Sequence, residues 1–365
     1  MLGTPALASD GRSARLSVPL PGGSGAAALR ISDPTGAALC VQLDSVAAPD
    51  GTPWVTSAAG DLGPYCLSCP QRVSVGVGYG LFILPSNDQA PELPAAFDVV
   101  AGVRDCSTLL PTAAGAAAGT AAGSATQLRI EGRFPPTVEP ARAGVISLGL
   151  AFLGGSPLAD PATRAAVLPG ALLEVNTLLG PGALQVVVAR TRTLDQETGA
   201  LELTRGQGGP LDALFAGVLG AGDCAPPVGD GWVPVVFAGC IRLTDPLQQM
   251  TSEPDGMTLG IPDGFAPPGR AQGIYLKGQS CRPEVAPAPI DWTPSMLGRL
   301  LAHELGHYLG LYHSVEADGT VDQLADTDAT NLMYYSPLTL SAPTFSPSQF
   351  RVMRRHPAIS FGPPE

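Results

Sequence analysis

The spacing of three histidines constrains this chain more than any other feature of its sequence. His303 and His307 stand four residues apart, and His313 follows six residues after the second. Residues four apart lie on one face of an α-helix, with Cβ atoms roughly 6 Å from each other. Imidazoles at that separation can bind one Zn²⁺ with bonds of about 2.0–2.1 Å. The spacing therefore predicts a helix that carries two ligands of a zinc site.

The third histidine requires that this helix end before it. In a continuing helix, His313 would lie about 9 Å beyond His307 and about 240° around the axis from it. Gly310 can adopt a positive φ and turn the chain back, so that His313 completes the site. Three neutral imidazoles leave a fourth position for water, which is typical of catalytic rather than structural zinc. Glu304 lies about 100° around the helix from His303 and can act on that water as a general base without being a ligand.

Two helices near the C-terminal end have clear start signals. Thr293 is a good N-cap for the histidine helix, and the proline after it suits the first helical position. Ser346 and Gln349 have the spacing of a capping box, which predicts a last helix that runs to Arg355. The remaining histidine, His356, follows that helix, and we expect it at the surface.

Residues 1–110 are predicted to form an antiparallel β-sandwich. Short alternating or β-branched runs recur there, and turn signals that contain Gly, Pro, Asn and Asp separate them. Such runs and turns are typical of small all-β domains. The predicted strands are residues 14–20, 28–32, 39–44, 72–77, 80–84 and 96–100.

An Ala/Gly-rich linker is predicted at residues 111–126, which carry no charge and almost no large side chain. A second domain, residues 127–365, follows it. Strands and a helix alternate there as in an α/β layer with a mostly parallel sheet. The predicted strands are residues 145–153, 183–192, 233–238 and 274–277, and the helix is residues 160–179. Glycines flank the last of these strands, which we expect at the sheet edge. Between 195 and 272 the long Gly/Pro-rich stretches have the length of binding loops and receive no other assignment.

Seven cysteines indicate an oxidising compartment, so we expect a secreted or cell-envelope protein, although the first twenty residues show no signal peptide. Four of the cysteines precede the linker, at positions 40, 66, 69 and 106, and two disulfides are expected there in any of three pairings. Cys66 and Cys69 are also compatible with half of a zinc site, but no second pair of this kind completes it. The odd total leaves at least one thiol free or paired between chains.

The charge and hydropathy of the chain exclude two classes of partner. Twenty basic and thirty-two acidic residues give a formal net charge of −12, and no basic run exists. Nucleic-acid binding depends on Lys and Arg that neutralise phosphates, so we expect no nucleic-acid partner. No run of eighteen or more apolar residues occurs, so we expect no transmembrane segment. The oligomeric state does not follow from the sequence.

The pattern H-E-x-x-H-x-x-G-x-x-H resembles that of the metzincin clan of zinc metallopeptidases. Eighteen residues beyond its last histidine, Asn331–Ser336 is similar to the Met-turn, which places a methionine, here Met333, beneath the metal. The form of this run most resembles the pappalysin-like members, whereas Ser314, directly after the third histidine, is what matrixins show. Tyr335 matches the tyrosine that several metzincins place near the zinc as a fifth ligand or oxyanion donor.

This resemblance implies a zinc-dependent endopeptidase that acts on a protein or peptide substrate. Its catalytic domain would contain a twisted mixed sheet, an active-site helix, the Met-turn and a C-terminal helix. It implies Zn²⁺ as the cofactor, His303, His307 and His313 as its ligands, and Glu304 as the general base. The substrate is expected to lie extended along residues 274–277.

Several alternatives stay open at the level of sequence. A secreted binding or surface protein whose β-sandwich carries the function would contain the same motif in an inactive zinc domain. The first domain can equally be a prodomain or a binding domain, and an unpaired cysteine can hold such an enzyme latent on the zinc. Asp322, Asp326 and Asp328 offer clustered oxygen ligands for Ca²⁺, with a solvated acidic loop as the other interpretation.

Overall fold

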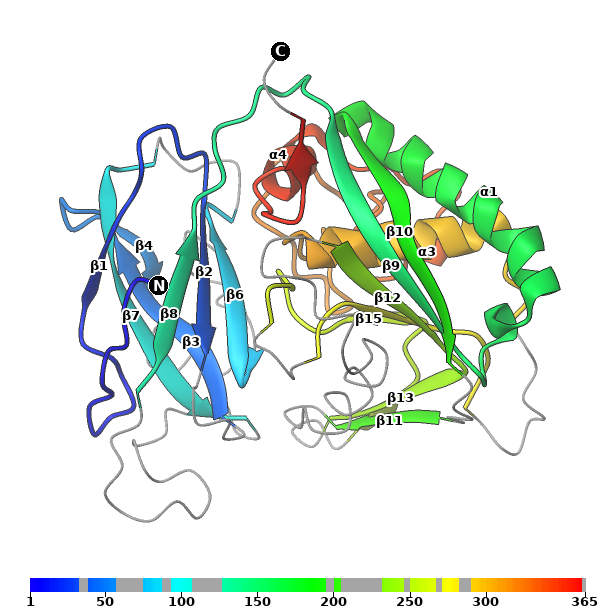
Figure 1. Cartoon of the computed structure of the whole chain (residues 1–365), viewed down its shortest axis with the longest axis horizontal. Coiled ribbons are helices and arrows are strands. Elements are labelled where there is room, and N and C mark those ends of the chain that lie inside the picture. Colours follow the sequence, from blue (N-terminus) through cyan, green and yellow to red (C-terminus); the bar gives the residue numbers. More distant parts are fainter. Residues whose placement is uncertain are drawn as a thin grey trace.

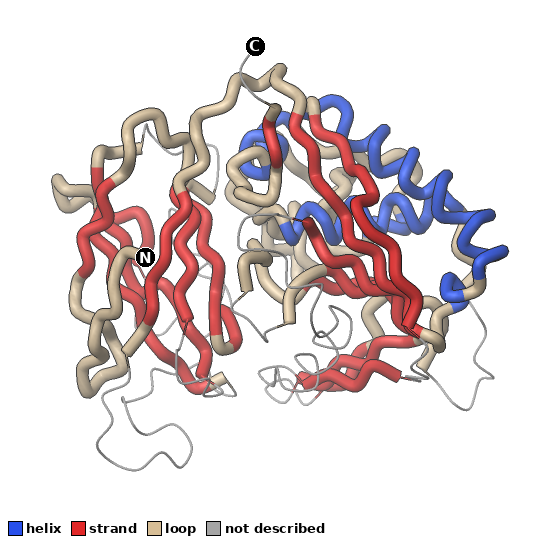
Figure 2. Tube along the Cα trace, viewed as in Figure 1, coloured by secondary structure: helices blue, strands red, loops and turns tan. Residues whose placement is uncertain are grey.

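The computed structural model describes residues 1–32, 39–56, 75–86, 93–106, 127–194, 200–204, 232–245, 250–266, 271–281 and 290–362. Within these ranges the chain is a mixed α/β protein with many strands and few helices (Figure 2). The strands gather in two regions (Figure 1), which we call the N-terminal unit, residues 1–133, and the C-terminal unit, residues 144–362. None of the helices in the described ranges has the length and apolar character needed to cross a membrane.

The N-terminal unit consists of two antiparallel sheets that share one hydrophobic core. One sheet has the order β1-β7-β3-β4, with β5 paired to β3, and the other has the order β6-β2-β8. Their strands are β1 (Leu16–Pro19), β2 (Ala27–Ser32), β3 (Leu39–Ala47), β4 (Pro53–Thr56), β5 (Gly76–Val77), β6 (Tyr79–Leu84), β7 (Ala96–Asp105) and β8 (Arg129–Arg133). Leu29 and Phe82 from one sheet pack with Val41 and Phe97 from the other in the shared core. Each predicted strand of this region has a counterpart, although the start of the run at 72–77 lies outside the described residues.

Strand β8 comes after the predicted linker, which itself lies outside the described residues. It pairs with β2 through Ile130 opposite Ile31 and Gly132 opposite Leu29. The chain therefore returns to the N-terminal unit after residue 126, and the first strand of the other region begins only at Gly144.

The C-terminal unit is built on a sheet of order β10-β9-β12-β16-β15, with β17 also paired to β9. Its strands are β9 (Gly144–Leu153), β10 (Leu184–Leu194), β12 (Trp232–Ala238), β15 (Gly256–Thr258), β16 (Ile274–Lys277) and β17 (Ser360–Phe361). Strand β9 runs parallel to β10 and β12, and β12 runs parallel to β16, whereas β15 and β17 are antiparallel to their partners. The mostly parallel sheet expected from the sequence is confirmed.

The prediction that residues 274–277 form the sheet edge is wrong. Strand β15 pairs with β16 on its outer side, through Met257 opposite Tyr275. All of Ile274, Tyr275 and Leu276 are fully buried, as expected of an inner strand. Three residues are too few to show a strand period, so β15 gave no signal inside the unassigned Gly/Pro-rich stretch.

Helices cover one face of this sheet (Figure 1). They are α1 (Pro161–Leu179) and α3 (Pro294–Tyr308), accompanied by the 3₁₀ turns η1 (Pro157–Ala159), η2 (Gly180–Gly182) and η3 (Pro337–Thr339). Asp160 caps α1 by accepting a 2.7 Å hydrogen bond from the Thr163 backbone N–H, and the helix continues through Pro169. Phe152 and Val235 of the sheet pack with Leu301 of α3 in the main core.

A small sheet of order β11-β13-β14 packs against the opposite face of the main sheet. Its strands are β11 (Ala200–Thr204), β13 (Cys240–Asp245) and β14 (Met250–Ser252). Leu203 and Ile241 of this sheet form a second core with Ala151 and Val236 of the main sheet. The strands β9 and β12 are therefore covered on both faces, which explains why they are almost continuously apolar.

Two disulfides link described segments. Cys40 of β3 is bonded to Cys106 at the end of β7, and Cys240 of β13 is bonded to Cys281 after β16. The first bond is one of the pairings that the sequence left open, while the other three cysteines lie outside the described residues. Disulfides are typical of proteins in oxidising, extracellular environments.

The last helix, α4 (Pro347–Met353), begins with the predicted capping box. Ser346 Oγ accepts from the Gln349 backbone N–H, and Gln349 Oε1 accepts from the Ser346 backbone N–H. The helix ends two residues earlier than predicted, and the expectation of a surface position for His356 is wrong. His356 is only 1% exposed, and its ring lies between the Asp263 carbonyl and the Ala358 backbone N–H. Because a segment almost a hundred residues away supplies one partner, the local sequence could not indicate burial.

Candidate metal centre

Local sequence signals fix both ends of α3. Thr293 Oγ1 accepts a 3.2 Å hydrogen bond from the Met296 backbone N–H at the first turn. At the other end Gly310 has a φ of 106°, and its N–H donates to the His307 carbonyl. The Leu311 N–H donates to the Gly306 carbonyl, which completes a Schellman motif. The helix therefore stops where the sequence predicted, and the chain turns back toward it.

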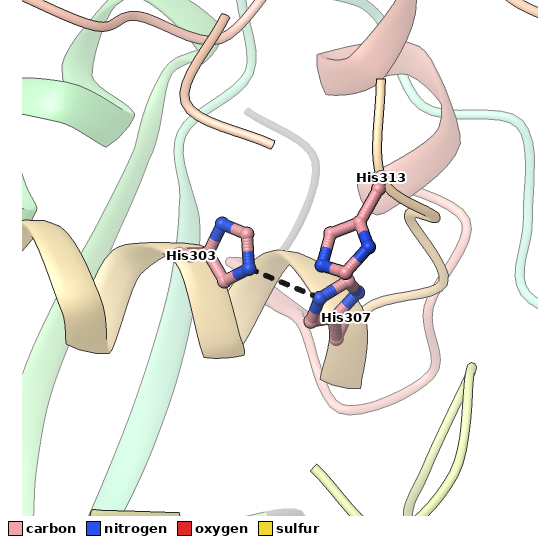
Figure 3. Close-up of side chains that lie close together, drawn as sticks. All are labelled: His303, His307 and His313. Carbon is pink, nitrogen blue, oxygen red and sulfur yellow. Dashed lines mark hydrogen bonds between the residues drawn. The ribbon is translucent and has the colours of Figure 1, made fainter. Parts of the chain in front are cut away.

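This turn brings the three predicted ligands together. His303 and His307 project from α3, and His313 approaches from the segment that follows it, so that the three rings face one another (Figure 3). One ring nitrogen of each histidine lies within 4.8 Å of those of the other two, and Nε2 of His303 and Nε2 of His307 are 3.1 Å apart. In the described part of the chain, these residues are the only group of His, Cys, Asp and Glu side chains gathered closely enough to hold a metal ion.

The hydrogen bonds around the rings identify the nitrogens that remain for a metal. Nδ1 of His303 lies 2.8 Å from the Leu332 carbonyl, and Nδ1 of His307 lies 2.7 Å from the Leu311 carbonyl. These carbonyl oxygens can only accept, so each Nδ1 carries the proton and each Nε2 presents a lone pair. Burial, with a smaller effect from the neighbouring His313, lowers the pKa of His303 to about 3, which keeps the ring neutral.

His313 follows the same pattern with a stronger partner. Its Nδ1 lies 2.6 Å from Oε2 of Glu316, so the carboxylate selects the tautomer with a free Nε2. Three Nε2 lone pairs then converge without a proton between them, an arrangement that a divalent cation would stabilise. Tetrahedral zinc bonds of about 2.0–2.1 Å would separate the ligand nitrogens by roughly 3.4 Å, close to the 3.1 Å observed for the first pair. The donor set therefore fits a metal ion.

Glu304 is buried beside this group and is held from the neighbouring strand. The Thr258 hydroxyl lies 2.9 Å from Oε2 of Glu304 and 2.9 Å from the Glu304 carbonyl. A Cβ atom on Gly256 would come within 2.8 Å of Oε1, so a side chain at this point of β15 would displace the carboxylate from its observed position. In the metal-free chain burial raises the pKa of Glu304 to about 8, because it outweighs the hydrogen bond from Thr258.

The run that contains Met333 lies directly under the helix. Met333 is fully buried, and its sulfur packs against Gly306, which lies in α3 between His303 and His307. A Cβ atom added to Gly306 would lie only 2.5 Å from Sδ of Met333. Asn331 Oδ1 accepts from the Met333 backbone N–H and from Nε2 of Gln349, which ties the run to the start of α4. The Ser314 N–H donates to the Met333 carbonyl, so the same run also fixes the chain next to His313.

Tyr335 lies near this group in the chain, but no contact joins its hydroxyl to the histidines in the described structure. Its side chain is 43% exposed, its ring lies 4.6 Å from that of Tyr334, and its backbone N–H donates to the Val315 carbonyl. A role for Tyr335 at the metal remains a prediction.

The acidic residues proposed as Ca²⁺ ligands do not converge on one point. Asp322 accepts from the Leu324 N–H and the Thr327 hydroxyl, and Asp328 accepts from Thr330. Asp326 accepts from Ser346 and Ser348 at the start of α4. Asp322 and Asp328 stabilise turns and Asp326 stabilises the start of α4, which gives the calcium site no support.

Three residues of the site were not identified from the sequence. Thr258 and Gly256 lie on the short β15, 46 and more residues before Glu304, and Glu316 is one acid among several that follow His313. A carboxylate three residues after a ligand was the one available clue, because ligating histidines usually donate their second ring N–H to such a group.

Comparisons with known proteins add little to this geometry. No family model matches the chain, and no curated protein matches it. Among solved structures, metalloproteinase-II from Bacteroides fragilis aligns with a TM-score of 0.33 and 16% sequence identity. The alignment covers 60% of this chain and 55% of that chain, so it spans little more than half of that protein. The class of this protein therefore rests on the site itself.

Proposed function

We propose that this chain is a zinc-dependent endopeptidase with a metzincin-like catalytic domain. One observation carries the proposal: each of the three histidines has its Nδ1 beside an acceptor, and their Nε2 lone pairs converge beside a buried glutamate. Three neutral nitrogen ligands are typical of catalytic zinc, which keeps a coordination position for substrate or water. His303, His307 and His313 would hold the ion.

The metal would supply Lewis-acid chemistry by polarising a carbonyl oxygen and activating water. Glu304 would take the proton from the attacking water as general base and return it to the leaving amine. The hydrogen bond from Thr258 would hold one carboxylate oxygen in place and leave the other for the proton. Because the carboxylate is buried and excluded from bulk water, its interactions with charge that develops at the substrate are strong.

Two further residues have supporting roles in this proposal. Met333 would form the floor of the centre, since its sulfur packs against Gly306 under the helix. Tyr335 would donate a hydrogen bond to the oxyanion, and its exposed ring can turn toward a bound substrate. The N-x-M-x-Y-S run in which both occur is most similar to pappalysin-like metzincins.

The substrate would lie along β15 rather than along β16. Strand β15 ends the sheet order, and its residues Gly256 and Thr258 contact Glu304. An extended peptide can add to such an edge by main-chain hydrogen bonds. Two disulfides are consistent with action on proteins outside the cytoplasm.

Glu304→Gln provides the direct test, because it keeps the shape of the side chain and removes its basicity. We expect the variant to bind one zinc per chain and to cleave an unfolded protein or a peptide library several orders of magnitude more slowly. Glu202→Gln, on β11 of the small sheet where the side chain is 56% exposed, is the matched control and should cleave normally. Cleavage by Glu304→Gln at the wild-type rate would contradict the proposal. Zinc binding without cleavage by the wild type would favour a binding protein with an inactive zinc domain.

A further inference from the structure

The N-terminal unit presents a face that is buried by the C-terminal unit. All six residues of β6 are buried, although β6 is the last strand in the order β6-β2-β8. Phe82 and Leu84 point into the core of the N-terminal unit, while Leu81 and Ile83 form a second cluster with Ala26 and Ala28. Phe265 of the C-terminal unit packs against that cluster. In Figure 1, β6 is the strand of its sheet that lies beside the C-terminal unit.

Phe265 belongs to a segment, Ile261–Ala266, that we call the strap. Arg30 of β2 donates a 2.6 Å hydrogen bond from Nη1 to the Phe265 carbonyl. The guanidinium of Arg133 in β8 lies over the Phe265 ring, 3.9 Å from its centroid. Two strands of the N-terminal unit therefore hold the strap through charge-assisted and cation–π contacts.

Asp263, in the middle of the strap, forms a third connection. It is 2% exposed, and its carboxylate accepts from the backbone N–H groups of Gly264 and Gly273 at 2.7 and 2.6 Å. The hydroxyl of Tyr79, on β6, lies 3.0 Å from Oδ1 and completes its surroundings. Burial raises the pKa of Asp263 to about 6, although the hydrogen bonds from Gly273, Gly264 and Tyr79 each lower it. Without Tyr79, this buried oxygen would lose one of its partners.

The other side of the strap contacts the turn between the second and third histidines. The Asp263 N–H donates to the Tyr308 carbonyl at 3.1 Å, which satisfies a carbonyl in the last turn of α3. The Tyr312 hydroxyl donates to the Ile261 carbonyl at 3.3 Å, and Pro262 lies opposite Gly310. Tyr308 and Tyr312 are the immediate neighbours of His307 and His313, so the strap spans the turn that positions the third ligand.

We infer that the N-terminal unit is a permanent positioning part of the metal centre and not a removable prodomain. Tyr79 and Arg30 act through the strap on the turn that carries His313, and they touch neither the metal ligands nor the substrate site. Loosening the strap would reduce the fraction of molecules in which the Nε2 atoms of all three histidines converge. The apparent affinity for the metal falls in proportion to that fraction. This inference rests on the metal-binding part of the proposed function.

The test compares zinc affinities of full-length variants in a competition with a chelating dye. Tyr79→Phe removes only the hydroxyl, and Arg30→Met removes only the charged group. We expect each to weaken zinc binding by about threefold to tenfold, the effect of losing a hydrogen bond to the strap. Arg129→Met is the matched control, because Arg129 pairs with the same Glu131 as Arg30 but is not bonded to the strap. It should bind zinc like the wild type.

A cobalt spectrum separates this role from a general loss of stability. At saturating Co²⁺ the two strap variants should show the wild-type d–d absorption, because all three ligands remain, but they should need more metal to reach it. Equal zinc affinity of Tyr79→Phe, Arg30→Met and the wild type would overturn the inference while leaving the peptidase proposal intact. An equal loss in Arg129→Met would also overturn it. Normal zinc binding with no cleavage by the wild type would instead remove only the proposed activity.

Discussion

The carboxylate of Glu316 lies 2.6 Å from Nδ1 of His313. The other two histidines donate to backbone carbonyls, so His313 is the one whose orientation depends on a side chain. It is also the one outside the helix, in a turn whose geometry a single glycine permits. His313 is therefore the adjustable part of the candidate centre.

Glu316→Ala should weaken zinc binding by about 10- to 100-fold, the usual effect of removing the partner of a ligating histidine. The ring of His313 would lose both its preferred tautomer and its orientation. Glu316→Gln retains an acceptor oxygen and should recover most of the affinity, as measured by dye competition. Equal zinc affinity in Glu316→Ala and the wild type would show that the pair has no positioning role.

Gly310→Ala should destabilise the turn through backbone strain alone. A Cβ added there would have its nearest neighbour at 3.7 Å, so no clash occurs, but a φ of 106° is unfavourable for any L-residue. We expect a loss of about 1–2 kcal/mol in unfolding free energy and weaker zinc binding. Gly23→Ala, at a φ of 82° with open space around it, is the matched control. It should lose stability by a similar amount and bind zinc normally.

Thr258→Val should lower kcat/KM by about tenfold, because Glu304 loses the hydroxyl that holds its carboxylate. Zinc content should not change, since neither residue is a ligand. Thr258→Ser, which retains the hydroxyl, should recover activity in the same peptide assay. Thr251→Val, on β14 of the small sheet, is a control at a threonine that pairs with Thr244. Full activity in Thr258→Val would mean that packing alone positions Glu304.

His356 should make the folded chain sensitive to acid. Burial lowers its pKa from 6.5 to about 4, because it outweighs the hydrogen bond from Nε2–H to the Asp263 carbonyl, which favours the charged ring. Nδ1 accepts from the Ala358 backbone N–H, so it is unprotonated in the folded chain. Its stabilising effect is complete above pH 6.5 and is lost as the pH falls through 4. The neighbouring Asp263, with its pKa raised to about 6, has the opposite dependence and loses stability as the pH rises through that value.

The His356 contribution is isolated by comparing the wild type with His356→Gln, since Asp263 is present in both. The difference in unfolding free energy should shrink by up to about 3 kcal/mol between pH 6.5 and 4. Denaturant titrations at several pH values measure it. A difference that stays constant over this range would mean that His356 titrates normally in the folded chain.

Local signals in the sequence were sufficient for the histidine helix. Thr293, the spacing of the first two histidines and Gly310 specify its start, its metal-binding face and its end, and each acts within a few residues. The same holds for the capping box at Ser346. The mostly parallel sheet could also be predicted, because β9 and β12 are covered on both faces and therefore appear in the sequence as long apolar runs.

The remaining parts depend on contacts between distant segments. Thr258 reaches Glu304 across 46 residues, and Tyr79 reaches Asp263 across 184. Strand β15 is too short to show a period, and the burial of His356 depends on the strap. Each of these features lies where the Gly/Pro-rich stretch between 195 and 272 meets another element. Such positions give no local signal, because their partners are determined only by the completed fold.

Zinc K-edge X-ray absorption of the metal-loaded protein identifies the atoms bound to the metal and their distances. We predict one zinc per chain with three imidazole nitrogens at about 2.0–2.1 Å and one oxygen, and two imidazoles in His313→Ala. Sulfur ligands, fewer than three imidazoles in the wild type, or a His313→Ala spectrum identical to that of the wild type would contradict a zinc centre made of these three histidines.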